Sequence, residues 1–274
     1  MVDNPLRLLI LGAHPDDAEY HAGGLAAIYR GLGHKVRMIS VTNGGAGHHR
    51  YSSEELVQIR RREAAAAGAV IGAVYETWDN PDGSLLPTLD VREQIIREIR
   101  TFQPDLVVTH RTNDYHPDHR AVGQAVQDAS YMVTVPLVVT DVPFLRKDPV
   151  VAYMADLFTK PCPFRPDVVL DVTELVDTIV DMMACHESQF YDFLPFNHGV
   201  ADDVPDDDDE KKSWLIDWFH RRTGDRADRF RDALIDTYGS ERGNSIRFME
   251  AYEISEYAAG VDDARKKQLF PSPD

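Results

Sequence analysis

The sequence has little cysteine, a shortage of basic residues and no long apolar stretch. Cys162 and Cys185 are its two cysteines, which excludes a disulfide framework and is typical of a reducing compartment. Lys and Arg number 29 against 46 Asp and Glu, and the resulting net charge of -17 disfavours binding to nucleic acid or to an anionic membrane. No stretch approaches the roughly 20 apolar residues of a membrane span, and residues 1–5 lack the basic cluster of a secretory signal. We therefore expect a cytoplasmic protein with no nucleic-acid or membrane partner.

The first half of the chain alternates apolar runs of strand length with helical patterns. This alternation predicts βαβ units and therefore an α/β fold: a Rossmann-like, doubly wound, mainly parallel sheet. The expected strands are Leu6–Leu11, Lys35–Thr42, Val74–Trp78 and Asp105–Thr109, and the expected helices are Gly23–Leu32, one from Ser52 or Ser53 to Ala69, Val91–Phe102 and Asp118–Ser130.

The second half is less regular and ends in helical patterns. Its acidic run, Ala201–Glu210, has little to bury and is predicted to form a mobile surface loop. No repeat and no long linker interrupts the chain, so we expect a single domain over 1–274, with a core of about 1–195 and a helical C-terminal addition of about 211–274. The other expected elements are the strands Val150–Met154 and Asp167–Val172 and the helices Val176–His186, Lys211–Arg222 and Asp225–Tyr238.

Two short segments, His14–Asp17 and His116–His119, combine histidine and carboxylate directly after predicted strands. Open α/β sheets bind ligands beyond the carboxyl ends of their strands, so both segments can share one site. Catalytic zinc typically takes three protein ligands, from imidazole and carboxylate groups, and a water molecule. The sequence therefore predicts a metal site in which His14, Asp17 and His119 are the ligands.

The remaining polar residues of the two segments suit proton transfer. A metal ion lowers the pKa of its bound water from about 16 toward 7, so Asp16 can act as the general base. His116 is predicted to stabilise an oxyanion, with Asp118 orienting its ring and keeping it protonated. Another interpretation stays open: Pro15 and Pro117 suit the first turn of a helix, where an acidic neighbour is simply a helix-start residue.

Ala13–Glu19, followed by Gly23-Gly24, and His116–His119 resemble the two signatures of the LmbE-like (PIG-L) family. Members of this family are zinc-dependent N-deacetylases and amidases with a Rossmann-like fold, and they act mostly on N-acetylglucosamine derivatives. Further similarity occurs, in the family's order, at Arg60 with Glu63, Asp82-Gly83 and His186–Gln189.

The resemblance carries specific expectations for function. It implies a small-molecule, amino-sugar-like amide substrate and a Zn²⁺ cofactor, for which Fe²⁺, Co²⁺ or Mn²⁺ could substitute. It also suggests a homo-oligomer, a trimer or a hexamer. By position it implies His14, Asp17 and His119 as metal ligands, Asp16 as general base, His116 with its partner Asp118 as stabiliser of the tetrahedral intermediate, Arg60 at the substrate pocket and Asp82 at a sugar hydroxyl.

Several other histidines have ambiguous positions. His21 is predicted to lie at the surface or to pack against residues of the site, and His186 is predicted either to lie near the site or to be a hydrogen-bonded structural residue. His48 and His49 lie in a glycine-rich loop at the same sheet edge, where they either touch substrate or are incidental. Thr178–Asp181 replaces a region where the family often carries lysine, which leaves the substrate open. No role is predicted for His34, His110, His198 and His220.

The leading hypothesis is removal of an acetyl group from an N-acetylglucosamine-type amide by attack of a metal-bound water. Two histidines and one carboxylate also form the facial triad of non-haem iron oxygenases, which is one alternative. A nucleotide-binding Rossmann protein is the other. Its Gly-x-Gly-x-x-Gly fingerprint is absent from the first turn, which reads Gly12–Asp17.

Overall fold

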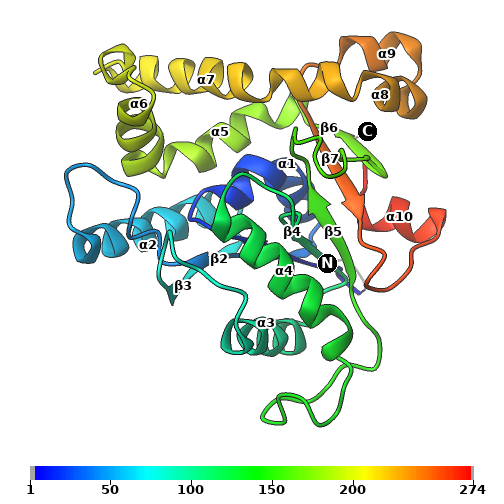
Figure 1. The fold of residues 1–274 in the computed structure, drawn as a ribbon. Helices are drawn as coiled ribbons and strands as arrows, with labels where there is room; N and C mark the ends of the chain where they lie inside the picture. Colours follow the sequence, from blue (N-terminus) through cyan, green and yellow to red (C-terminus); the bar gives the residue numbers. More distant parts are fainter. Residues whose placement is uncertain (1–3, 273–274) are drawn as a thin grey trace.

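The computed structural model describes residues 4–272 and is built on a seven-stranded sheet with the order β3-β2-β1-β4-β5-β7-β6 (Figure 1). The first five strands in sequence run parallel, and β7 pairs antiparallel with both β5 and β6. The predicted α/β fold with a mainly parallel sheet is therefore confirmed. The strands are β1 (Arg7–Gly12), β2 (Lys35–Thr42), β3 (Val74–Asn80), β4 (Leu106–Thr109), β5 (Val150–Met154), β6 (Val168–Asp171) and β7 (Met249–Ile254).

Helices cover both faces of the sheet, as the unbroken apolar pattern of β1 requires. Successive side chains of a strand point to opposite faces, so Leu8 and Ile10 join one core cluster while Leu9 and Leu11 join the other. The first cluster is covered by α1 (Asp17–Gly31), α2 (Ser53–Val70), α5 (Val176–Ala184) and α7 (Asp208–Arg229), and the second by α3 (Leu89–Phe102) and α4 (Pro117–Met132).

The order of the strands reverses between β1 and β4. From β1 the chain proceeds outward to β2 and β3, whereas β4 returns to the other side of β1. Leu11 pairs with Thr109 in parallel register, so the loops that follow these two strands leave the same edge of the sheet. This is the position at which doubly wound sheets bind their ligands.

Both segments predicted to carry the chemistry lie at helix starts. α1 begins at Asp17 rather than at the expected Gly23, with a kink at Ala22 that the apolar pattern did not show. α4 begins at Pro117, and its N-cap residue His116 accepts the N–H of Asp118 on its side chain. A proline at the first helical position fits because its missing N–H has no partner in the helix.

The C-terminal third differs from the expected organisation. The acidic run is not simply a loop, because Ala201–Asp203 forms a short 3₁₀ turn and α7 begins at Asp208. α7 continues through the break expected between residues 222 and 225, and the chain bends at Phe230 before α8 (Arg231–Tyr238). Trp218 and its neighbours on α7 pack into the core cluster of α1 and α5, which holds this helix against the domain (Figure 1).

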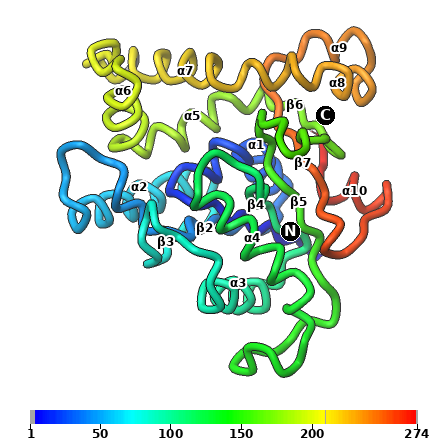
Figure 2. The backbone as a smooth tube through the Cα atoms, viewed as in Figure 1, coloured from blue at the N-terminus to red at the C-terminus, as the bar shows by residue number. Residues whose placement is uncertain are grey.

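Strand β7 was not predicted, because the buried Glu250 interrupts its apolar pattern. The Glu250 carboxylate accepts the N–H groups of Gly24 and Leu25 at 2.6 and 2.9 Å. Figure 2 shows the chain returning through β7 to the sheet between β5 and β6. Two short helices, α9 (Ser240–Ser245) and α10 (Asp263–Leu269), were also not predicted.

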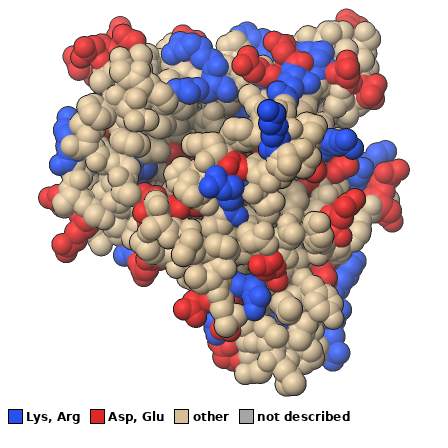
Figure 3. Space-filling model, viewed as in Figure 1, with Lys and Arg blue, Asp and Glu red and all other residues tan. Residues whose placement is uncertain are grey.

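Within residues 4–272 we find no helix with the length and apolarity needed to cross a bilayer. On the face shown in Figure 3, acidic and basic side chains are interspersed. The single-domain organisation and the cytoplasmic location stay predictions, and residues 1–3 and 273–274 of the predicted domain lie outside the described residues.

Candidate active site

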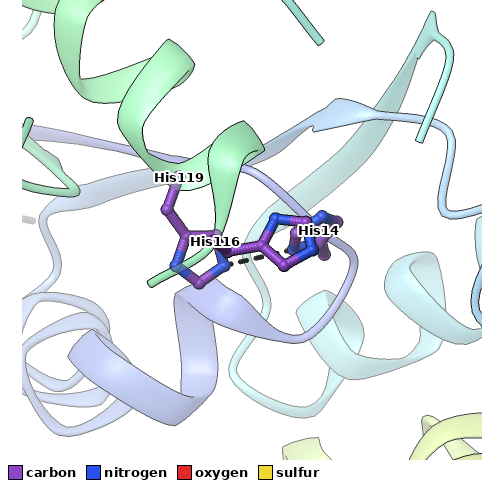
Figure 4. Close-up of side chains that lie close together, drawn as sticks. All are labelled: His14, His116 and His119. Atoms are coloured by element: carbon purple, nitrogen blue, oxygen red, sulfur yellow. Dashed lines mark hydrogen bonds between the residues drawn. The ribbon is translucent and has the colours of Figure 1, made fainter. Parts of the chain in front are cut away.

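His14, Asp17 and His119 come together at the sheet edge, as predicted. Figure 4 shows His14 in the loop after β1, with His116 and His119 on the first turn of α4. His119 Nε2 lies 3.2 Å from His14 Nδ1 and 3.5 Å from Asp17 Oδ1, and His14 Nδ1 lies 3.6 Å from Asp17 Oδ2. Ligand atoms about 2.1 Å from a tetrahedral ion lie roughly 3.4 Å apart. The spacing of these atoms therefore fits a divalent metal ion.

Carboxylates orient both imidazole rings for metal binding. His14 Nε2 lies 3.2 Å from Asp82 and 3.3 Å from Asp118. His119 Nδ1 lies 3.1 Å from Asp114. With these nitrogens protonated toward carboxylates, Nδ1 of His14 and Nε2 of His119 keep the lone pairs that a metal requires. Residues outside the ligand set thus fix both tautomers.

Asp17 is held as an ionised carboxylate. Its Oδ2 accepts the N–H groups of Ala13 and His14 at 2.8 and 2.7 Å, which leaves Oδ1 directed toward His119. Burial alone would raise the pKa of Asp17, but His119 and His110 lower it, and the net pKa is well below the usual range. Asp17 is therefore charged and ready to bind a cation.

His110 is a site residue that sequence reasoning missed. Its Nε2 lies 3.1 Å from Asp17 Oδ2, and its ring stacks on that of His119 with 4.0 Å between centroids. The sequence could have indicated it, because His110 directly follows Thr109, the last residue of β4, at the sheet edge that carries the predicted metal ligands. His110 adds a third imidazole next to the predicted metal ligands.

Asp16 occupies a strained and buried position beside this cluster. Its backbone has φ of 142°, a conformation that L-residues rarely adopt and that tends to occur at functional sites. Its N–H donates to the Tyr75 hydroxyl at 3.0 Å, and Gln189 Nε2 donates to Asp16 Oδ2 at 2.8 Å. Burial and the neighbouring Asp17 raise the pKa of Asp16 to about 7. A carboxyl group with this pKa can both accept and return a proton near neutral pH.

Arg60 is buried next to Gln189 and does not line the cavity. The side chain is 2% exposed and donates to Gln189 Oε1 and, at 3.2 Å, to the Gly47 carbonyl. Gln189 thereby links Arg60 to Asp16. Arg60 is not among the residues that line the cavity at the predicted metal site, and its role at the substrate pocket stays a prediction. Gln189 was visible in the sequence only as the last residue of the His186–Gln189 motif.

In the structure the Asp118 carboxylate contacts groups other than its predicted partner His116. The Asp118 carboxylate accepts the N–H groups of Gly83 and Leu85 at 2.7 and 3.1 Å and faces His14. His116 packs edge-on against His14 instead, with ring centroids 4.5 Å apart. Burial and the neighbouring imidazoles lower the pKa of His116, so the structure favours a neutral ring over the predicted imidazolium.

Asp82 also lies against His14 instead of facing the open cavity. It accepts the N–H of Ala46 at 2.9 Å in addition to its contact with His14 Nε2. The structure therefore places Asp82 where it orients a predicted metal ligand, and the expected contact with a sugar hydroxyl is not needed to explain its position.

Two of the ambiguous histidine positions have structural partners. His186 forms an ion pair with Glu19 in which both side chains are fully buried, and this pair ties α1 to the segment after α5. His48 Nδ1 accepts the N–H of Arg50 at 3.0 Å, and its Nε2 lies 3.2 Å from Asp192. His48, His49 and Asp192 form a second group of possible ligands that does not line the cavity at the predicted metal site.

A cavity of about 480 Å³ opens over the predicted metal site. This volume suits a small molecule. His21 and His198, for which no catalytic role was predicted, also line it. The metal end is formed by His14, Asp16, Asp17, Asp114 and His119, with the Tyr115 ring 5.5 Å from that of His119. The other lining residues include Phe158, Phe190, Leu194, Trp218, Arg222 and Arg226.

Replacing Asp114 tests whether the ring of His119 is oriented for metal binding. We expect Asp114→Asn to weaken metal affinity about 10–100-fold, because an amide no longer favours the Nδ1–H tautomer of His119. Competition with a metal-chelating dye measures the affinity. The exposed Asp128→Asn is the matched control, and equal affinity of both variants would contradict the orienting role.

Comparison with known proteins gives a family and several relatives. Residues 9–130 match the model of the PIG-L family, described as GlcNAc-PI de-N-acetylase. The resemblance inferred from the motifs is thereby confirmed. Over 205 residues the chain is 24% identical to the 4-oxalmesaconate hydratase of Pseudomonas putida, a match that covers 70% of this chain and 79% of the hydratase.

Two further similarities concern amide-cleaving proteins. The mycothiol S-conjugate amidase of Streptomyces coelicolor is 30% identical over 141 residues, which is 42% of this chain and 48% of the amidase. The chain thus spans about half the length of that relative. The N,N'-diacetylchitobiose deacetylase of Pyrococcus horikoshii has a TM-score of 0.68 and 21% identity, over 92% of this chain and 84% of that one. At this identity the likeness shows the shared fold.

Proposed function

We propose that this chain, whose residues 9–130 match the PIG-L family model, is a zinc-dependent hydrolase that removes an acetyl group from an N-acetylglucosamine-type amide. The observation that carries the proposal is the Asp16 carboxylate beside the closely placed side chains of His14, Asp17 and His119 at one end of a cavity. A bound Zn²⁺ supplies a Lewis acid that polarises a carbonyl oxygen and lowers the pKa of water. Two imidazoles and a carboxylate are ligands that zinc accepts.

Asp16 is the general base of the proposed reaction. Its carboxylate removes a proton from the water that attacks the acetyl carbonyl carbon, and Gln189 holds the carboxylate in place. When the C–N bond breaks, Asp16 returns the proton to the leaving amine, and the products are acetate and a free amine.

His116 is proposed to stabilise the oxyanion as a neutral donor. Its Nδ1 accepts the N–H of Asp118 at 3.2 Å, so the proton of the neutral ring resides on Nε2. A neutral N–H donor needs no imidazolium, which agrees with the lowered pKa of this ring. His14, Asp17 and His119 remain the proposed metal ligands, with Asp82, Asp114 and Asp118 as the carboxylates that orient them.

Hydration of a carbon–carbon double bond is the second candidate. The observation that favours it is the similarity to a hydratase over 79% of that protein's length. Both reactions need a water molecule and a base such as Asp16, so the site chemistry is shared.

The two alternatives from the sequence have less support. The glycine-rich fingerprint of nucleotide-binding Rossmann proteins is replaced here by the His14–Asp17 turn. Oxygen consumption with a 2-oxo acid would reveal the remaining alternative, the iron oxygenase.

The proposed function is tested with metal-quantified protein and a panel of N-acetylglucosamine glycosides and conjugates. We expect equal amounts of acetate and free amine from at least one member. A parallel assay follows the loss of the absorbance of unsaturated carboxylic acids. Hydration there, with no acetate from any amide, would replace deacetylation by the second candidate.

A further inference from the structure

The cavity contains a buried arginine without a carboxylate partner. Arg226 on α7 is 6% exposed and lines the cavity. Its guanidinium donates to His21 Nδ1 at 3.1 Å and lies 5.2 Å from the centroid of the Tyr20 ring. Among the side chains that the structure describes, which do not include that of Asp209, no Asp or Glu oxygen lies within 4.0 Å of the Arg226 guanidinium. Buried charges are normally paired, so this one has capacity for an anion.

The neighbours of Arg226 do not neutralise its charge. Burial, Arg226 itself and His110 lower the pKa of His21 well below the usual range, so His21 is a neutral acceptor. Arg226 lowers the pKa of the buried Glu250, but the Glu250 oxygens already accept two backbone N–H groups and, at 2.7 Å, the hydroxyl of Tyr252. Arg226 therefore lines the cavity without an ion-pair partner of its own.

A second arginine lies one turn away on the same face of α7. Arg222 also lines the cavity, and its guanidinium lies 5.3 Å from the centroid of the Trp218 ring. Residues four apart on a helix are neighbours, so the two guanidinium groups can act on one ligand.

The acidic groups of the cavity are located at the metal end or are already paired. Asp156 accepts two hydrogen bonds from Arg111, at 2.6 and 2.7 Å. Asp114 faces His119, and Asp17 faces the predicted metal ligands. The cavity thus has a metal-binding end and, at α7, a basic wall.

We propose that Arg226 and Arg222 form a carboxylate-binding subsite, so that the substrate carries a carboxylate at a distance from the bond that reacts. Arginine matches a carboxylate with two parallel N–H···O hydrogen bonds and keeps its charge when buried. The assignment of the reacting bond as an acetamide rests on the proposed function. The subsite itself can be tested without turnover.

Binding of succinate to the metal-free protein tests the subsite directly. Metal-free protein is used so that succinate cannot bind through the metal ion, and succinamide is the uncharged control ligand. By calorimetry we expect succinate to bind the wild type at least tenfold more tightly than it binds Arg226→Gln. Arg229→Gln, an exposed position of the same helix outside the cavity, should bind like the wild type.

Thermal melting identifies an Arg226→Gln protein that fails to fold. In that event Arg222→Gln, at an exposed position, and Arg226→Lys, which keeps the charge, replace it. We expect Arg222→Gln to weaken succinate binding and Arg226→Lys to retain part of it. Absence of succinate binding in the wild type, or equal binding by the folded arginine variants, overturns the subsite.

A pair of substrates separates this inference from the proposed function. The carboxymethyl glycoside of N-acetylglucosamine and its carboxamide differ in one negative charge. We expect the wild type to favour the carboxylate at least tenfold in kcat/KM and Arg226→Gln to lose this preference. Equal kcat/KM values in the wild type overturn the subsite but leave deacetylation intact. No acetate from either compound counts against deacetylation, and the succinate experiment then still decides the subsite.

Discussion

Asp16→Asn should lower kcat about 10²–10⁴-fold while leaving the metal content unchanged, which is the range that a general base contributes. An amide has the size of the carboxylate and can still contact Gln189, but it cannot remove a proton from water. Asp16 lies next to the predicted ligand Asp17 without belonging to the ligand set, so the metal should stay bound. Steady-state acetate release and metal quantification by mass spectrometry measure the two effects.

The exposed Asp128→Asn serves as the control for the loss of one carboxylate elsewhere on the molecule. It should retain wild-type kcat and metal content. A near-normal rate for Asp16→Asn would show that another group is the base. If Asp16→Asn also lost its metal ion, Asp16 would be a metal ligand, and a neighbouring residue would have to be the general base.

His119→Ala should abolish both metal binding and turnover. His119 Nε2 lies within 3.5 Å of both other predicted ligand atoms, so its removal leaves two ligands where catalytic zinc requires three. We expect the metal content after gel filtration to fall from about one ion per chain to nearly none. The rate of acetate release should fall to background, and added Zn²⁺ should restore little of it.

His49→Ala is an informative control for His119→Ala. His49 belongs to the second group of possible ligands, with His48 and Asp192, away from the predicted site. If the functional ion binds at His14, Asp17 and His119, the His49 variant keeps both metal and activity. Loss of the ion from the His49 variant, together with its retention in His119→Ala, would move the metal centre to the second group.

The fold could be predicted from local sequence patterns because each βαβ unit is encoded over a short stretch. β2 and β5 have the predicted bounds, and the strands that carry both motifs lie side by side as expected. β7 could not be found in this way, since Glu250 is a charged residue buried by contacts with a helix more than two hundred residues earlier. Hydrophobic periodicity does not contain that information.

The sequence by itself determined the position of the candidate site and supplied its proposed ligands, because two polar motifs follow strands that a parallel sheet brings to one edge. Only the tertiary structure showed which side chain contacts and orients each site residue. Asp118 orients His14 across a separation of 104 residues, and Gln189 reaches Asp16 across 173. Arg226 lines the cavity because α7 packs back onto the core and brings it to His21, 205 residues away. Such contacts depend on packing between segments that are distant in the sequence, whereas a motif contains information only about residues close together in the chain.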